Sequence, residues 1–415
     1  MLNELFEAET RTNEEKRVSA YSGEGKPTLP ASVNHLTALD DLNLNWTEKD
    51  LPEKERTKHV HRLHPYLGKY IPQLVEIFLR KFFKKGDTVV DPFCGSGTTM
   101  VQANELGINS IGFDISAFNV LLTRVKTSDY DIKVLKKEAR MLLERVKIET
   151  AGITRPMDLF SGENHCNGQF STENEYLNNW FAEKALKELL IYKHYLNDFT
   201  YKDVYQIVLT RSARSSRLTT HFDLDFPKRP QLEPYHCYKH NRICQPTNEA
   251  YKFLERYTLD TVKRIEDFSK IKTSASVIAK HADSRYAEFE EVDGLITSPP
   301  YVGLIDYHNQ HRYAYELLGL ADNASLEIGA AKRGNSLKAK EEFKSSLVEV
   351  FRNAAARIKK GGKIIIVAGD RDNLYPEIAE RAGLHLFYKL ERHVNRRTGR
   401  RSGEFFESVF IYEVE

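Results

Sequence analysis

The segment from Thr88 to Leu106 most strongly constrains the fold. A short β-branched run, Thr88-Val89-Val90, ends at Asp91 and leads into the turn Pro92-Phe93-Cys94-Gly95-Ser96-Gly97, followed by a helical pattern from Thr98 to Leu106. Glycines let a ligand approach the backbone, and the free N–H groups of a helix N-terminus point toward that ligand. The segment therefore predicts a strand, a ligand-binding turn and a helix that ends at Gly107.

The segments before and after this one predict an α/β fold with a parallel sheet. A proline near its start and apolar residues near helical spacing predict a buried amphipathic helix over His64 to Phe83. Strand and helix patterns alternate downstream, which is typical of parallel sheets. We expect strands at 109–114, 276–278, 294–296 and 363–368, helices at 132–148 and 341–358, a turn at 359–362, and a closing antiparallel pair at 384–392 and 405–413.

The alternating pattern is interrupted between residues 150 and 276. This stretch is irregular and rich in Tyr, His, Asn and Arg, so we interpret residues 151–275 as an insertion between sheet strands. The sheet domain is then split into 59–150 and 276–415, and the polar residues 1–58 form an N-terminal arm or cap.

Composition excludes several classes of protein. The 415 residues are 41% hydrophobic and 29% charged, as in ordinary globular proteins, and 61 Lys and Arg against 59 Asp and Glu leave a net charge of only +2. Contacts with a polyanion must therefore come from local patches. The apolar run 364–368 is far shorter than the roughly 20 residues of a membrane span, so we expect a soluble protein without membrane contact. The N-terminus lacks a secretory signal and the four cysteines suit a reducing compartment, which favours the cytoplasm.

The residues of the first turn narrow the class of ligand. A carboxylate at Asp91 would repel a pyrophosphate, but it suits a ligand that carries an ammonium and a sulfonium. The third glycine of a dinucleotide fingerprint is missing, because Thr98 and Thr99 follow Gly97. Asp114, at the end of the next strand, can accept hydrogen bonds from both ribose hydroxyls.

A second turn, Ser298-Pro299-Pro300-Tyr301, follows the predicted strand that ends at Ile296. Open α/β sheets place their chemistry at the carboxyl ends of strands. Two adjacent prolines remove two N–H donors, so the turn presents carbonyl oxygens that can orient an exocyclic amine. Ser298 adds a hydroxyl acceptor, and Tyr301 adds a ring on which an extruded base can stack.

Together, VVDPFCGSGTT and TSPPY resemble the amino-methylating DNA methyltransferases, and SPPY is similar to their cytosine-N4 branch. The resemblance implies a Rossmann-like class I methyltransferase fold that binds S-adenosylmethionine. It implies that three segments bind the cofactor and that the inserted region recognises the target DNA. The implied cofactor-binding residues are Asp91, Pro92, Phe93, Gly95, Ser96, Gly97, Thr98, Thr99, Asp114 and Ile115; His64, Pro65, Lys69, Tyr70 and Ile71 over the methionine end; and Asp283 and Ser284 at the adenine.

The implied reaction is direct methyl transfer to N4 of a cytosine extruded from duplex DNA, with Ser298, Pro299, Pro300 and Tyr301 as the catalytic turn. Three alternatives stay open: adenine-N6 methylation, methylation of an RNA amine, and a catalytically silent nucleic-acid-binding protein. Restriction–modification and epigenetic marking are the expected settings, with a cognate restriction endonuclease as a further candidate partner. The motif order resembles the α arrangement, although the insertion here precedes His281-Ala282-Asp283 rather than following it.

Two basic segments are candidate DNA contacts. The predicted residues are Arg211, Arg214, Arg217 and Lys239 in the insertion, and Arg396, Arg397, Arg400 and Arg401 in a late loop. We also considered zinc at His236, Cys237, His240 and Cys244, but the spacing lacks a CxxC pair. The sequence therefore favours ordinary buried cysteines there, and predicts no metal.

Overall fold

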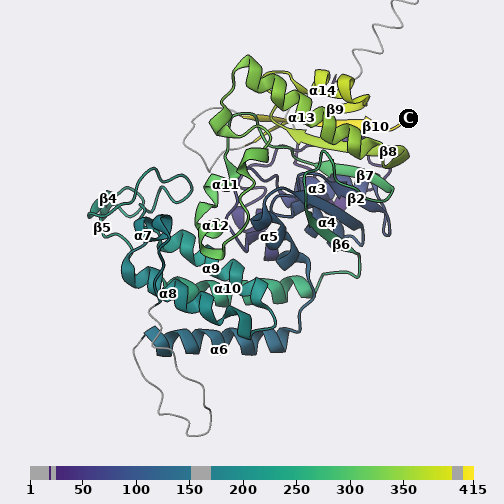
Figure 1. The fold of residues 1–415 in the computed structure, drawn as a ribbon. Helices are drawn as coiled ribbons and strands as arrows, with labels where there is room; N and C mark the ends of the chain where they lie inside the picture. Colours follow the sequence, from purple (N-terminus) through teal and green to yellow (C-terminus); the bar gives the residue numbers. More distant parts are fainter. Residues whose placement is uncertain (1–17, 20–24, 151–169, 395–404) are drawn as a thin grey trace, which may run out of the picture.

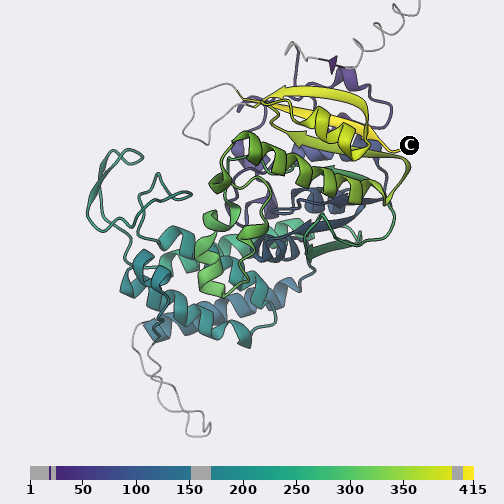
Figure 2. The same cartoon turned by 45° about the horizontal axis from the view of Figure 1, so that its top comes forward.

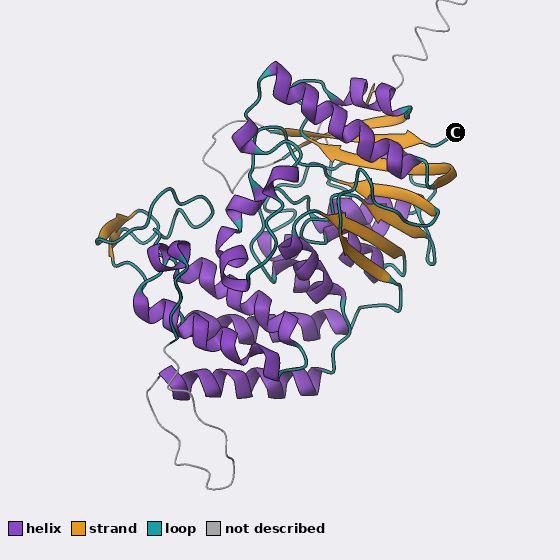
Figure 3. Ribbon diagram, viewed as in Figure 1, coloured by secondary structure: helices purple, strands orange, loops and turns teal. Residues whose placement is uncertain are grey.

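A computed structural model describes residues 18–19, 25–150, 170–394 and 405–415. Within these residues, one eight-stranded sheet has the strand order β1-β9-β10-β8-β7-β2-β3-β6 and lies at the upper right of Figures 1 and 3. Its strands are β1 (Val18–Ser19), β2 (Thr88–Asp91), β3 (Asn109–Asp114), β6 (Val277–His281), β7 (Val292–Thr297), β8 (Ile358–Ala368), β9 (His385–His393) and β10 (Phe406–Glu413). Neighbouring strands from β8 to β6 are parallel, and β10 lies antiparallel between β8 and β9. The predicted Rossmann-like α/β fold is confirmed.

Helices cover both faces of the sheet because the strands are apolar on both sides. In β8, Ile365 and Val367 pack with α3 (Pro72–Phe82) and α4 (Thr98–Glu105). Ile364 and Ile366 face the opposite layer, which contains α13 (Leu337–Ala355) and α14 (Tyr375–Ala382). This alternation follows the two-residue period of a strand, whereas the parallel order of β8, β7, β2 and β3 decides which turns meet at the carboxyl edge of the sheet.

Two local predictions are wrong. The helix expected from His64 begins only at Pro72, because a proline suits the first helical position and Ile71 before it is extended (ψ 145°). The turn expected at 359–362 lies inside β8 as an irregularity: the register moves from Val292 opposite Ile358 to Gly294 opposite Lys363. These four residues do not end the strand, because the Gly361 N–H donates to the Val414 carbonyl and the Gly362 carbonyl accepts from the Val414 N–H.

The long insertion forms a helical unit beside the sheet (Figures 1 and 2). It lies between β3 and β6 in the chain, after α5 (Ala117–Thr127). Its helices are α6 (Ile132–Thr150), α7 (Glu175–Trp180), α8 (Glu183–His194), α9 (Lys202–Ser216) and α10 (Tyr251–Ser269). Their apolar side chains share one core with Phe118 and Leu122 of α5. We propose that α6 belongs to this unit, since it packs on α8 and α10.

Three smaller parts complete the fold. Residues 25–58 lie against α3, where Val33, Leu39 and Leu42 enter the core of that face, and they include α2 (Glu53–Arg56). Between β7 and α13 lie α11 (Tyr307–Gln310) and α12 (Arg312–Leu318), and α12 contacts α9. A separate two-stranded hairpin, β4 (Tyr235–Cys237) and β5 (Arg242–Cys244), projects from the helical unit at the left of Figure 1. No helix in the described ranges is long and apolar enough to cross a bilayer.

Candidate functional site

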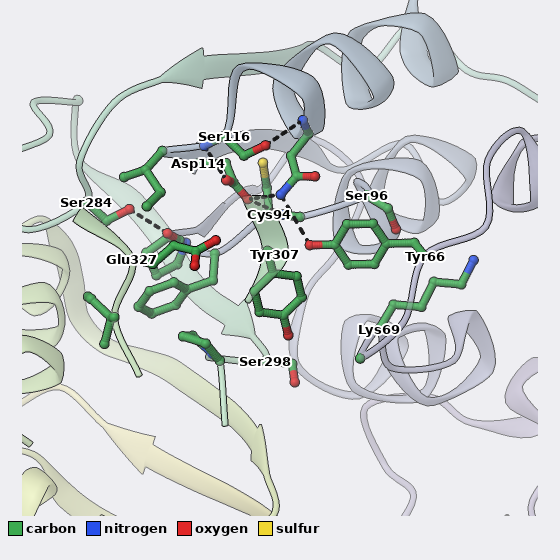
Figure 4. Close-up of a pocket in the computed structure, with 18 of the residues that line it drawn as sticks. Tyr66, Lys69, Cys94, Ser96, Asp114, Ser116, Ser284, Ser298, Tyr307 and Glu327 are labelled. Atoms are coloured by element: carbon green, nitrogen blue, oxygen red, sulfur yellow. Dashed lines mark hydrogen bonds between the residues drawn. The ribbon is translucent and has the colours of Figure 1, made fainter. Parts of the chain in front are cut away.

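A cavity opens at the carboxyl ends of β2, β3 and β7, where the two sequence motifs meet. It encloses about 820 Å³ including its mouth. Figure 4 shows side chains from several elements around this space, among them Tyr66, Asp114, Tyr307 and Glu327. Of the predicted residues, the cavity is lined by Lys69, Tyr70, Pro92, Phe93, Gly95, Ser96, Thr98, Asp114, Ile115, Asp283, Ser284, Ser298 and Pro300.

The glycine turn is held in shape by Asp114. Its carboxylate accepts hydrogen bonds from the Gly95 N–H at 2.9 Å, the Ser116 N–H at 2.8 Å and the Asn119 side-chain amide at 3.1 Å. Burial raises the pKa of Asp114, and the two N–H donors and the amide oppose that rise. An ionised carboxylate has about four acceptor sites, so Asp114 can hold this loop and still accept a hydrogen bond from about one hydroxyl group of a ligand.

Asp91 lies beneath the turn and does not line the cavity. Its carboxylate accepts hydrogen bonds from the Thr297 hydroxyl at 2.6 Å, the Thr99 hydroxyl at 2.5 Å and the Phe93 N–H at 3.0 Å. Burial raises the pKa of Asp91 to about 6. These contacts tie β2, α4 and β7 together, so in this structure Asp91 positions the turn from below.

The remaining predicted cofactor residues also lie outside the cavity lining. His64 is fully buried, with Nδ1 at 2.8 Å from the Pro65 carbonyl oxygen and its ring edge-on to Phe118. Ile71 packs with the core below α3, and Gly97 and Thr99 sit at the start of α4. Lys69 does line the cavity, and its ammonium donates to the His61 carbonyl at 2.8 Å; burial lowers the pKa of Lys69 to about 8.

Several lining residues have no counterpart in the sequence prediction. Tyr66, from the segment expected to be helical, stacks with Tyr307 at a centroid distance of 5.8 Å. Glu327 is buried, and its Oε1 accepts from the N–H of His308 at 2.8 Å. Its Oε2 has no hydrogen-bond partner in the described structure, which leaves an acceptor at the cavity wall. Ser116 and Asn119 could have been found from the sequence, because Ser116 lies two residues after Asp114 and serine is a typical N-cap residue, here accepting from the Asn119 N–H.

The lining fits the ligand that the sequence predicts. Asp114 and the free Oε2 of Glu327 supply acidic acceptors for hydroxyl and ammonium groups, and the tyrosine rings supply apolar surface. Asp283, expected at an adenine amine, lines the cavity but forms an ion pair with Arg285 at 2.5 Å. Ser284 donates to the Pro92 carbonyl at 2.5 Å and so joins the loop after β6 to the glycine turn.

A second cavity adjoins the first across the Ser298-Pro299-Pro300-Tyr301 turn. It encloses about 910 Å³ including its mouth, and its wall includes Tyr301, Phe405 and the residues that follow β8. The rings of Tyr301 and Phe405 are 6.1 Å apart, and the Tyr301 hydroxyl donates to Glu407 at 2.9 Å. Ser298 lines the first cavity, Tyr301 lines the second, and Pro300 lines both.

The structure does not present three of the predicted DNA-binding arginines to solvent. Arg211 pairs with Asp260 at 2.6 Å, Arg214 pairs with Asp225 at 2.5 Å, and the buried Arg217 lies over the Tyr313 ring at 4.5 Å. Each guanidinium thus has a partner within the protein: Asp260 lies on α10, Asp225 lies after α9, and Tyr313 lies on α12. Lys239 is exposed on the β4–β5 hairpin, whereas Arg396, Arg397, Arg400 and Arg401 lie outside the described residues.

Replacing Gly97 with alanine should destabilise the turn. Gly97 has φ +76° at the start of α4, and an added Cβ would lie 2.7 Å from the Thr123 hydroxyl oxygen. We expect a loss of about 1–3 kcal/mol in the free energy of unfolding, measured by denaturant titration. Gly361→Ala is the matched control, since Gly361 has φ +78° with open space around the added atom. Equal losses in the two variants would contradict a close packing requirement at Gly97.

Comparisons with known proteins agree with this geometry. A family model described as DNA methylase, covering N6 and N4 methyltransferases, matches residues 6–123. The type II methyltransferase M.MjaII of Methanocaldococcus jannaschii is 39% identical over 88% of this chain and 82% of its own length. The type II methyltransferase M.BsoBI of Geobacillus stearothermophilus is 24% identical, over 70% of this chain and 59% of its own length.

Proposed function

Because the chain belongs to the type II DNA methyltransferases of the N6/N4 family, with S-adenosylmethionine as its cofactor, we propose that it methylates N4 of cytosine in duplex DNA. The observation that carries the proposal is the position of the SPPY turn between the two cavities. A cofactor on the Ser298 side and an extruded base on the Tyr301 side would then meet at this turn.

The chemistry requires an amine that is held and oriented. The cofactor supplies an electrophilic methyl group on a sulfonium. The N4 lone pair is conjugated with the cytosine ring, so acceptors that bind the amine hydrogens favour a more tetrahedral and more nucleophilic nitrogen. Ser298 suits this role because its hydroxyl lines the cavity and has no partner among the described residues. The Pro299 carbonyl is the second proposed acceptor.

The transfer also releases one proton. Transfer of the methyl group from the cofactor to N4 would leave the amine with one proton more than the product carries, and Ser298 or water would accept that proton. A strong general base is unnecessary, because the methylated amine is strongly acidic while it still carries this proton and therefore loses it readily. Catalysis in this proposal is therefore mainly positioning.

Product analysis tests the target atom directly. The full-length protein is incubated with labelled S-adenosylmethionine and duplex DNA of mixed sequence, and the digested nucleosides are separated and identified by mass. N4-methylcytosine is the expected product. N6-methyladenine would retain the family and cofactor but contradict the cytosine assignment. A parallel incubation with RNA distinguishes the RNA-amine alternative.

Tyr301 should act on the base and leave cofactor binding unchanged. A stacked aromatic contributes about 1–3 kcal/mol per base, so we expect Tyr301→Ala to lower kcat/KM for DNA about 5- to 150-fold. Tyr301→Phe should keep most of the activity, because it loses only the hydroxyl bond to Glu407, which retains its pairing with Arg392 at 2.8 Å. Equal losses in Tyr301→Ala and Tyr301→Phe would contradict stacking. Calorimetric titration with S-adenosylmethionine checks the unchanged cofactor affinity.

A further inference from the structure

Four potential metal ligands converge on the projecting lobe that we define as residues 218–246. They are His221, Cys237, His240 and Cys244, and their ligand atoms all lie within 4.8 Å of one another. Cys237 ends β4, Cys244 ends β5, and His240 lies in the turn between these strands. His221 comes from the chain just after α9, so the cluster joins both ends of the lobe.

The spacing of these atoms matches tetrahedral zinc. The Cys237 sulfur lies 3.5 Å from Nδ1 of His221 and 3.6 Å from Nδ1 of His240, and that same nitrogen lies 3.4 Å from the Cys244 sulfur. Zinc binds sulfur at about 2.3 Å and nitrogen at about 2.0–2.1 Å, which places tetrahedral sulfur and nitrogen ligands about 3.5 Å apart. All three distances are therefore within about 0.2 Å of the zinc geometry.

Hydrogen bonds alone account poorly for this convergence. A ring nitrogen has one proton or one lone pair, yet Nδ1 of His240 faces two sulfurs, and thiols are weak donors. His221 has a competing partner, because the Tyr235 hydroxyl lies 3.0 Å from its Nδ1. The same hydroxyl also accepts from the His221 backbone N–H at 3.0 Å and can keep that bond when Nδ1 binds a metal.

The lobe also lacks a core that would hold it together. Its buried apolar side chains are Leu218 and the two cysteines themselves, whereas Phe222, Leu232 and Tyr238 are 52%, 69% and 78% exposed. A two-stranded hairpin of this size is marginal without a covalent or metal cross-link. A metal ion bound to the two buried cysteines would therefore supply the cross-link that the hairpin otherwise lacks.

We propose that His221, Cys237, His240 and Cys244 bind one structural zinc ion that stabilises the lobe. All four positions belong to the protein, as in closed structural zinc sites. His236, which the sequence placed among the candidates, is exposed and lies edge-on to Tyr238. The ion would hold the exposed cations Lys228, Arg229, Lys239 and Arg242 of the lobe in a fixed arrangement.

Metal analysis of the full-length protein tests the site. The protein is expressed without a histidine tag in zinc-containing medium, and bound metals are measured by mass spectrometry. We expect about one zinc per chain in the wild type and in the control His236→Ala, and loss of most bound zinc in Cys237→Ser, Cys244→Ser and His240→Ala. His240→Cys should retain zinc, because a thiolate replaces the imidazole.

Three results would overturn the proposal. One is wild-type protein that stays free of zinc even after incubation with zinc under reducing conditions. Another is a disulfide between Cys237 and Cys244 in the protein as purified from reducing cytoplasm. The third is zinc retained in the Cys237→Ser/Cys244→Ser double variant, which would place the ion elsewhere, such as at the His59, His61 and Glu105 group.

Limited proteolysis provides a readout that does not depend on counting ions. The zinc-bound wild type should resist cleavage between residues 218 and 246, and chelation should expose this lobe to the protease. Because the ligands lie outside both cavities, S-adenosylmethionine affinity should be unchanged by chelation. Cleavage in the lobe at the same rate with and without chelator would contradict a structural role for the metal.

Discussion

Ser298→Ala should lower the rate of methyl transfer by about 100- to 1,000-fold, the cost of removing one positioned hydrogen-bonding group from a reaction site. Ser298 lines the first cavity just after the strand that leads into the catalytic turn, and its hydroxyl has no hydrogen-bond partner among the described residues. The alanine variant lacks the acceptor that orients the amine, while the backbone carbonyls of the turn stay in place. Single-turnover measurements with saturating DNA and cofactor report this step alone.

Two further measurements make the Ser298 result specific. S-adenosylmethionine affinity, measured by calorimetry, should change by less than about fivefold, since the loss of one neutral hydrogen bond costs about 1 kcal/mol or less when solvent can replace it. Ser346→Ala is the control, because its hydroxyl only bonds the Glu342 carbonyl on the exposed side of α13. A single-turnover rate of Ser298→Ala equal to that of the wild type would falsify the assigned role.

The second large effect is expected for Asp114→Asn, which should weaken S-adenosylmethionine binding about 10- to 150-fold, as hydrogen bonds to a charged group are worth about 1.5–3 kcal/mol. The carboxylate accepts from Gly95, Ser116 and Asn119 and also faces the cavity. An asparagine has one acceptor oxygen, and its amide group turns a donor toward other donors. Calorimetric titration of the cofactor measures the loss.

The pH dependence of binding adds a second check on Asp114. Burial raises its pKa, so the free protein takes up a proton at a higher pH than an exposed aspartate would. Ribose hydroxyls require the ionised acceptor, and the cofactor affinity of the wild type should therefore fall on acidification. Asp114→Asn should lack this fall, and Asp131→Asn is the control, since Asp131 accepts the Lys133 and Val134 N–H groups on an exposed helix start. A wild-type acid limb that persists in Asp114→Asn would assign the titration to another group.

The sequence was sufficient for the parts of the fold that depend on neighbouring residues. The strands at 88–91 and 109–114, the helix after Gly97 and the antiparallel pair at the C-terminus were predicted within a few residues. Each depends on a local pattern of β-branched residues, glycines and polarity that survives in any tertiary setting. Two parallel strands with turns at their carboxyl ends were enough to bring Asp114 and Ser298 to one edge of the sheet.

Only the tertiary structure decided which polar side chains face a ligand and which face the interior. Arg211 and Arg217 look like surface cations in the sequence, but α10 and α12 supply Asp260 and Tyr313 as partners from distant positions. Glu327 lines the cavity, and His221 rather than His236 meets Cys237, through long-range packing. Local sequence carries secondary-structure preference within a few residues, whereas burial and pairing depend on chain segments that meet only after folding.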